Sequence, residues 1–205
     1  MARKNDRAPM RKREILEHFQ QVLVEEGLEG ASMAKIASHM GVNPALLVHY
    51  FKTKDDMIVE LVDYILEKYE TTFSKRIEKI SNPSRRLKKN LDTMFSLDWI
   101  SIVDTRVFYT CYYLALRNPR VMERMQKMYS HFREYIAREI EFNMKSGVIP
   151  EADPEKDAEL VIAVVEGLAF YRNLSGGNRK YKELGSYLKQ RVVDMLQHRQ
   201  GSQSE

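Results

Sequence analysis

Apolar residues recur at helical spacing along almost the whole chain. Near the N-terminus, for example, Ile15, Phe19, Val22 and Leu23 fall on one face of a helix. Clusters of Gly, Pro, Asn and Ser separate the segments that carry this spacing, and no segment shows the apolar–polar alternation of a half-buried strand. The pattern predicts an all-α protein of about nine helices, with a small N-terminal unit followed by a larger helical bundle.

Residues 32–51 fit the frame of a helix-turn-helix motif, in which two short helices pack at a steep angle. Ala37 provides the small side chain that the close crossing needs, and Gly41 accepts the positive φ of a tight turn. Asn43 followed by Pro44 is typical of an N-cap and a first helical residue, so the second helix is predicted to begin there. The positions that must fill the wedge between the helices are apolar: Ile36, Met40, Val42, Leu47 and Tyr50.

The distribution of charge supports a DNA-contacting motif, whereas the total does not. The chain has 33 Lys and Arg against 29 Asp and Glu, and a net charge of +4 is too small to identify a partner. No acidic residue lies between Gly30 and Lys54, although this window holds Lys35, Lys52, Lys54, His39 and His49. A carboxylate facing DNA would be repelled by the phosphates, so this window is predicted to contact DNA.

A second basic segment precedes the motif and contains Arg3, Lys4, Arg7, Arg11, Lys12 and Arg13. It fits an extension that reaches a minor groove or phosphates, and it fits a solubilising tail equally well.

The stretch over residues 31–57, ASMAKIASHMGVNPALLVHYFKTKDDM, resembles the DNA-binding domain of the TetR (tetracycline-repressor-like) family. The family pattern is Ser or Thr, then Ile-Ala, Gly-Val, a Leu, aromatic residues, and Ser or Thr followed by Lys. The resemblance implies a helix-turn-helix domain over 9–69 and an effector-binding, dimerising helical domain over 70–200. Residues 1–8 and 201–205 are expected to be flexible tails.

The resemblance also implies the residues that contact DNA: Ser32, Lys35, Asn43, Pro44, Ala45, Leu46, Val48, His49, Tyr50, Lys52 and Lys54. Family members usually have Thr where this chain has Leu46, and Tyr where it has Val48. These two apolar side chains could contact thymine methyl groups instead of phosphates. They also leave open a second interpretation, in which the chain is an all-α dimeric interaction module with little or no DNA binding.

The middle of the chain is rich in aromatic residues and methionines, which line adaptable apolar pockets and also fill cores. The candidate effector-binding residues are Met94, Trp99, Phe108, Tyr109, Tyr112, Tyr113, Met125 and Met128. Because few charges accompany them, we expect a small apolar or amphipathic effector that modulates operator binding, most simply that of a repressor.

The last two predicted helices are apolar on more than one face, so both faces must be buried. One face is expected to pack against a second copy of the chain in a two-fold homodimer. The candidate interface residues are Leu160, Val164, Leu168, Tyr171, Leu184, Leu188 and Val192.

Several classes of function find no support in the sequence. There is no Gly-rich phosphate loop, no nucleophile elbow, and no Cys or His pair at metal-ligand spacing, so we expect no enzyme activity, cofactor or metal. The single cysteine, Cys111, cannot form an internal disulfide, which indicates a reducing compartment. The most apolar stretch, Leu160–Phe170, is too short to span a membrane and contains Glu166. These features favour a cytoplasmic protein that has no membrane partner.

Overall fold

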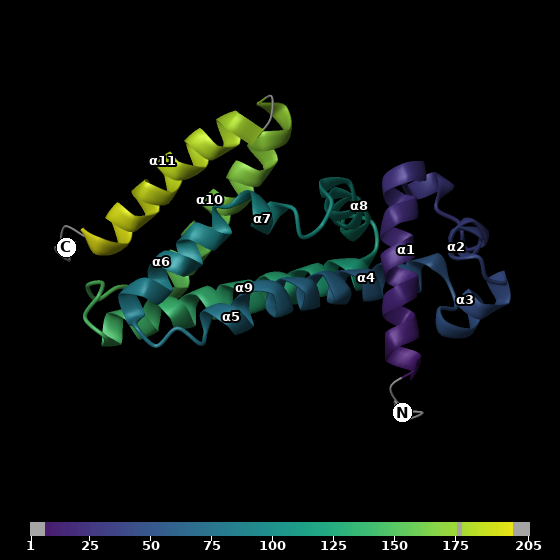
Figure 1. Cartoon of the computed structure of the whole chain (residues 1–205), viewed down its shortest axis with the longest axis horizontal. Coiled ribbons are helices and arrows are strands. Elements are labelled where there is room, and N and C mark those ends of the chain that lie inside the picture. Colours follow the sequence, from purple (N-terminus) through teal and green to yellow (C-terminus); the bar gives the residue numbers. More distant parts are fainter. Residues whose placement is uncertain (1–6, 176–177, 199–205) are drawn as a thin grey trace. The chain divides into compact units, whose positions relative to one another are not determined.

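The computed structural model describes residues 7–175 and 178–198, with the side chains of residues 7, 73 and 74 left out. The chain forms two compact units (Figure 1). The first unit contains the residues up to Lys68 together with Val103–Met128, and the second contains Tyr69–Ile102 together with the residues from Tyr129 onward. The tail residues 1–6 and 201–205, and with them Arg3 and Lys4, lie outside the described residues.

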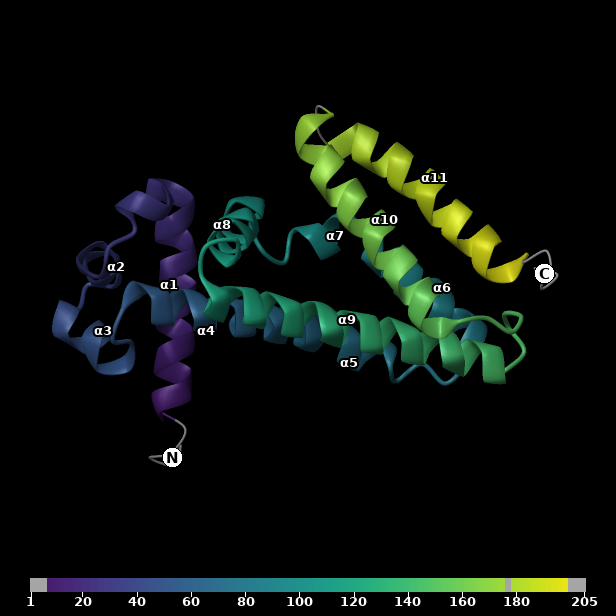
Figure 2. The same cartoon turned by 180° about the vertical axis from the view of Figure 1, so that it is seen from behind.

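The helices of the first unit are α1 (Arg7–Gly30), α2 (Met33–Met40), α3 (Pro44–Tyr50), most of α4 (Lys54–Tyr69), α8 (Thr105–Ala115) and the start of α9 (Pro119–Lys145). Helices α2 and α3 lie beside α1 in both views of the ribbon (Figures 1 and 2). The core of this unit consists of fully buried apolar side chains, among them Ile15, Phe19, Ile36, Leu47, Phe51, Met57 and Leu61.

Local sequence signals set the ends of these helices. α1 begins at Arg7, so residues 7 and 8 are helical, and Gly27 interrupts it with a φ of 71°. At the start of α4, Thr53 and Asp56 form a reciprocal cap: the Thr53 hydroxyl donates to the Asp56 carboxylate at 2.9 Å, and the Asp56 amide donates back at 3.1 Å.

The second unit contains the π-helical turn η1 (Glu70–Ser74), α5 (Lys75–Ile77), α6 (Pro83–Met94), α7 (Leu97–Ile100), the rest of α9, α10 (Pro154–Leu174) and α11 (Asn178–Gln197). Helices α10 and α11 run side by side in both ribbon views (Figures 1 and 2). Their inner faces pack on α6 and α9 around a core that includes Leu91, Ile140, Val161, Leu168 and Tyr181.

The all-α prediction is confirmed, since no strand occurs in residues 7–175 and 178–198. The short helices α5 and α7 add to the predicted set. No helix among the described residues is long and apolar enough to cross a membrane. The grouping of residues 103–128 with the first unit is a tertiary feature that the spacing of apolar residues did not indicate.

Candidate DNA-binding surface and effector cavity

The helix-turn-helix is built by local caps in the first unit. The Ser32 hydroxyl accepts a hydrogen bond from the Lys35 amide at 3.1 Å and starts α2. Gly41 ends α2 in the left-handed region, at φ 65° and ψ 33°, where its amide donates to backbone carbonyls of the last turn. The Asn43 side chain then accepts from the Ala45 amide at 2.9 Å and starts α3.

Helix α3 presents its candidate contact residues outward because a single residue anchors it. Leu47 is completely buried, whereas Val48 and His49 on the next positions are exposed. Leu46 and Tyr50 are half-buried, and the His49 and Tyr50 rings meet edge to face with centroids 5.1 Å apart. None of the eleven predicted DNA-contact residues lies in the core: eight are exposed, and Leu46, Tyr50 and Lys54 are half-buried.

The three candidate lysines differ in how freely they could reach a phosphate. The Lys54 ammonium donates to the backbone carbonyl of Leu28 at the end of α1, and burial lowers its pKa below the ordinary value. Lys35 forms an ion pair with Glu26 at 2.8 Å, and the hydrogen bond to that carboxylate raises the Lys35 pKa. Lys52 is exposed and has no ion pair among the described residues.

The described part of the basic N-terminal segment is engaged with its own unit. Arg11 pairs with Glu14 at 2.6 Å on α1, Lys12 pairs with Glu60 of α4 at 2.5 Å, and Arg13 pairs with Glu67 of α4. Lys12 and Arg13 therefore join α1 to α4, whereas Arg11 pairs within α1. These ion pairs favour a structural role over that of an extension for this part of the segment.

A cavity lies in the second unit among α6, α7, α9 and α10. It contains about 430 Å³ of space between atoms, part of which is open to solvent. Its lining is Met94, Trp99, Phe132, Tyr135, Ile136, Ile162, Val165 and Glu166. Two of the predicted effector-binding residues, Met94 and Trp99, are thus brought together there.

The other six predicted effector-binding residues belong to the first unit and are not part of this lining. Met125 and Met128 are buried core residues, Phe108 and Tyr109 are half-buried, and Tyr112 and Tyr113 are exposed on α8. Of these, Phe108 and Tyr109 contact each other edge to face at 5.7 Å.

Sequence reasoning missed the α9 and α10 residues of the cavity. Phe132 and Tyr135 lie in α9, and the spacing of apolar residues in this helix does not indicate which aromatic rings border a cavity. Glu166 carried a usable signal, because it is the only charge within the apolar stretch Leu160–Phe170. A charge in such a run needs a partner or a function.

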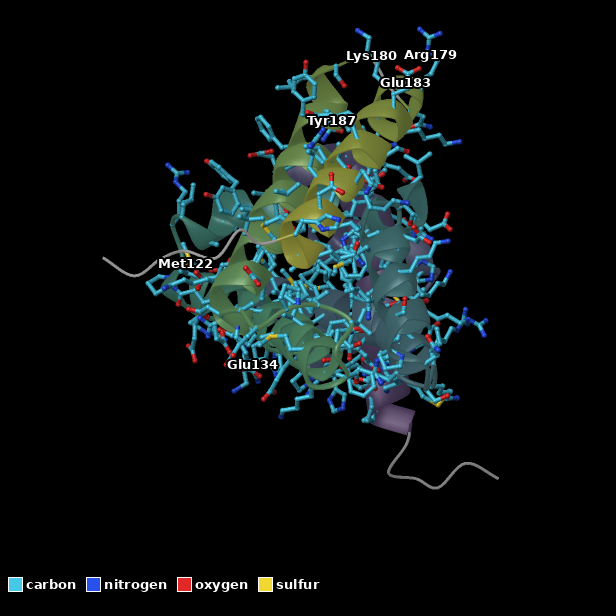
Figure 3. The ribbon with its side chains drawn as sticks, turned by 90° about the vertical axis from the view of Figure 1, so that its left-hand side faces the viewer. Met122, Glu134, Arg179, Lys180, Glu183 and Tyr187 are labelled. Carbon is cyan, nitrogen blue, oxygen red and sulfur yellow. The ribbon has the colours of Figure 1, made fainter. Side chains whose placement is uncertain are left out.

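The outer face of α10 is apolar and open. Leu160, Phe170, Tyr171 and Leu174 are between 42% and 69% exposed, and the space beside Gly167 is empty. Tyr187 of α11, which is labelled in Figure 3, is also exposed. The Arg191 guanidinium lies over its ring. Of the predicted interface residues, Leu168 and Val192 are instead buried in the core of their own chain, whereas Val164, Leu184 and Leu188 are half-buried.

The geometry thus combines a helix-turn-helix whose second helix is exposed with a helical unit that holds a cavity, the arrangement of a transcriptional regulator that binds DNA. The model of bacterial regulatory proteins of the tetR family matches residues 15–61. The model of the tetracyclin repressor-like C-terminal domain matches residues 81–198. The chain belongs to the TetR family of DNA-binding transcriptional regulators.

Individual relatives agree with this assignment. The HTH-type transcriptional regulator BetI of Rhizobium meliloti (strain 1021) is 23% identical over 169 residues, which are 81% of this chain and 79% of that protein. A TetR transcription regulator from Haloarcula marismortui has the same fold, with a TM-score of 0.78, 19% identity, and coverage of 90% of this chain and 97% of that chain. A transcriptional regulator from Saccharomonospora viridis, solved in complex with choline, gives a TM-score of 0.73, 20% identity, and coverage of 93% and 97%.

Proposed function

We propose that the chain is a repressor that binds an operator through α2 and α3 and responds to a small molecule held in the cavity of its second unit. The observation that carries this proposal is the acid-free helix-turn-helix, in which Leu47 is buried while Val48 and His49 of the same helix are exposed. Such a helix can enter a major groove without unfolding or repelling the phosphates.

Two further features support the regulatory part of the proposal. The cavity has the mostly apolar lining, with a single charged group, that is typical of a small-molecule site. The exposed apolar face of α10 suits a homodimer, in which two copies of α3 would lie ~34 Å apart on successive major grooves. We also propose that the protein acts in the cytoplasm and has no catalytic activity of its own.

Selection from a pool of random duplexes tests DNA binding and yields an operator sequence. A specific regulator should enrich a sequence with two related half-sites, and its affinity should fall steeply with salt because bound phosphates release counterions. His49→Ala should change the preferred sequence, whereas His198→Ala, a matched change outside the motif, should not. Enrichment of no sequence by the folded wild-type protein would refute the proposal.

The response to an effector is tested with the selected operator. A compound that binds in the cavity should release the operator, provided that it binds the free and DNA-bound conformations with different affinity. Choline is a reasonable first compound, since one solved relative of the same fold holds it.

A further inference from the structure

The cavity in the second unit is bordered by a cluster of aromatic rings. The Trp99 ring lies 4.7 Å from that of Tyr69 and 5.9 Å from that of Phe132, measured between centroids. Tyr69 and Phe132 are themselves 5.3 Å apart and meet edge to face. Trp99, Phe132 and Tyr135 are part of the lining. Because these rings pack directly on one another, a small group in the cavity can contact more than one of them.

Glu166 is the only charged residue that lines this cavity among the described residues. Its carboxylate has a hydrogen bond with Tyr129 and forms no ion pair within the described part of the chain. Burial raises the pKa of Glu166, and the hydrogen bond from Tyr129 offsets only part of that shift. A carboxylate in such surroundings is costly unless a cation compensates it.

Glu139, a glutamate of the same unit that is buried, shows the difference. The Glu139 carboxylate is paired with Arg86, whose Nε donates to it at 2.6 Å, and it accepts another hydrogen bond from the side-chain Nδ2 of Asn90 at 2.9 Å. Glu139 is thus neutralised by its own chain. The partner of Glu139 is an arginine, which carries a positive charge, whereas the partner of Glu166 is a neutral tyrosine. A compensating positive charge at Glu166 must therefore come from outside the chain or be absent.

The lining also restricts the kind of cation. A primary ammonium group needs an acceptor for each of its three N–H bonds. The cavity offers the Glu166 carboxylate and otherwise mostly apolar and aromatic surface. An alkylated ammonium has no such requirement, and aromatic rings attract it through the negative potential of their faces.

We propose that this cavity binds a small organic cation with an alkylated ammonium group, which contacts Trp99 and Phe132 while Glu166 provides the opposing charge. The inference rests on the proposed function, since it names the class of effector for that same site. It excludes anions, which would meet Glu166 with no lysine or arginine beside them among the described lining residues. It also excludes neutral apolar molecules as the preferred ligands.

Trp99 makes binding directly observable, because it is the only tryptophan in the chain. The probes are choline, tetramethylammonium, and the neutral alcohol in which a carbon atom replaces the nitrogen of choline. Titrations followed by tryptophan fluorescence and by calorimetry should show that choline binds at least about tenfold more tightly than its neutral counterpart, the discrimination expected of a desolvated cation–aromatic site. Equal or tighter binding of the neutral alcohol, or binding of neither cation, would overturn the inference.

Glu166→Gln keeps the shape of the side chain and removes its charge. It should weaken choline binding by about tenfold or more while leaving the neutral alcohol unaffected. Glu134→Gln is the matched control, since Glu134 lies on α9 close to Phe132 and Tyr135 in sequence but points away to the surface (Figure 3). Trp99→Leu, followed by calorimetry, should also weaken choline binding, whereas Trp99→Phe should retain most of it. Unchanged choline affinity in Glu166→Gln would refute the role of the carboxylate.

A stability measurement separates a binding role of Glu166 from a structural one. Because the folded-state pKa of Glu166 is raised, its contribution to stability is present at low pH and is lost as the pH rises through that pKa. Without ligand, Glu166→Gln should therefore melt at a higher temperature than the wild type near neutral pH, although it binds choline less well. A melting temperature below that of the wild type would indicate a structural carboxylate and overturn the inference.

Operator binding is measured separately by fluorescence anisotropy of labelled duplex. A protein that binds its operator but no cation would overturn the cation inference and leave the proposed function intact. A protein that binds choline through Glu166 but enriches no DNA sequence would support the cation site and refute the proposed function.

Discussion

Leu47 and Val48 are neighbours in α3, yet the structure gives them opposite surroundings. Leu47 is 0% exposed beneath α3, and Val48 is 55% exposed on the surface that we propose contacts DNA. Alanine at each position therefore tests the orientation of the recognition helix with a pair of matched substitutions.

The expected magnitudes follow from burial. Leu47→Ala should destabilise the protein by about 2–5 kcal/mol, the usual cost of emptying a buried leucine site. Val48→Ala removes two methyl groups, worth about 0.8 kcal/mol each when fully buried, and the folded chain already covers almost half of that side chain. Covering the remaining 55% against DNA would contribute about 0.9 kcal/mol, so the substitution should weaken operator binding by about fourfold. Its effect on stability should stay within about 0.5 kcal/mol, as for other surface changes.

The assay combines urea unfolding followed by circular dichroism with anisotropy of the labelled operator at fixed salt. The two variants should separate cleanly, with Leu47→Ala losing stability and Val48→Ala losing affinity alone. If Val48→Ala binds the operator as tightly as the wild type while His49→Ala also leaves the preferred sequence unchanged, α3 does not lie against the bases. The assignment of the DNA-binding surface would then be refuted.

Three further outcomes are expected. Lys52→Ala should weaken binding to all duplexes alike and reduce the salt slope by about one, as for loss of a single phosphate contact; a change in preferred sequence would contradict this role. The hydrogen bond from Arg120, helped by one from Thr53, holds the pKa of Asp56 below its ordinary value, so the wild type should lose stability as the pH falls through that lowered pKa. Arg120→Gln should raise the Asp56 pKa, measured by carboxyl NMR titration, and an unchanged value would show that the pair does not persist in solution. Arg86→Met should cost about 3–5 kcal/mol because it leaves Glu139 buried without its partner, and adding Glu139→Gln should recover much of that loss in urea unfolding.

The motif was predictable because its determinants are local. The N-caps Ser32 and Asn43 bond to amides two or three residues ahead, and Gly41 takes its positive φ within one turn. Such interactions can be inferred from short sequence windows. The helix-turn-helix frame also placed Leu47 in the wedge between the helices, and Leu47 is indeed buried.

The cavity was only partly predictable because it depends on tertiary packing. Met94 and Trp99 were inferred from the local abundance of aromatic residues and methionines. The six other residues inferred in the same way lie in the first unit. Nothing local distinguishes Phe132, which borders the cavity, from Phe108, which does not. The difference arises because α9 is divided between the two units at Met128 and Tyr129, so Phe132 belongs to the unit that holds the cavity and Phe108 does not. No spacing of apolar residues encodes that division.

The two sites nevertheless share a property that can be recognised from sequence. In α3 an apolar side chain, Val48, is exposed where solvent would favour a polar one, and in α10 the charged Glu166 lies where packing would favour an apolar one. Neither choice improves the stability of the isolated chain. The buried carboxylate of Glu139 is compensated by an ion pair with Arg86, whereas Glu166 has no such ion pair among the described residues. Residues that contradict their surroundings in this way are the ones expected to contact something outside the chain, DNA in the first unit and a cation in the second.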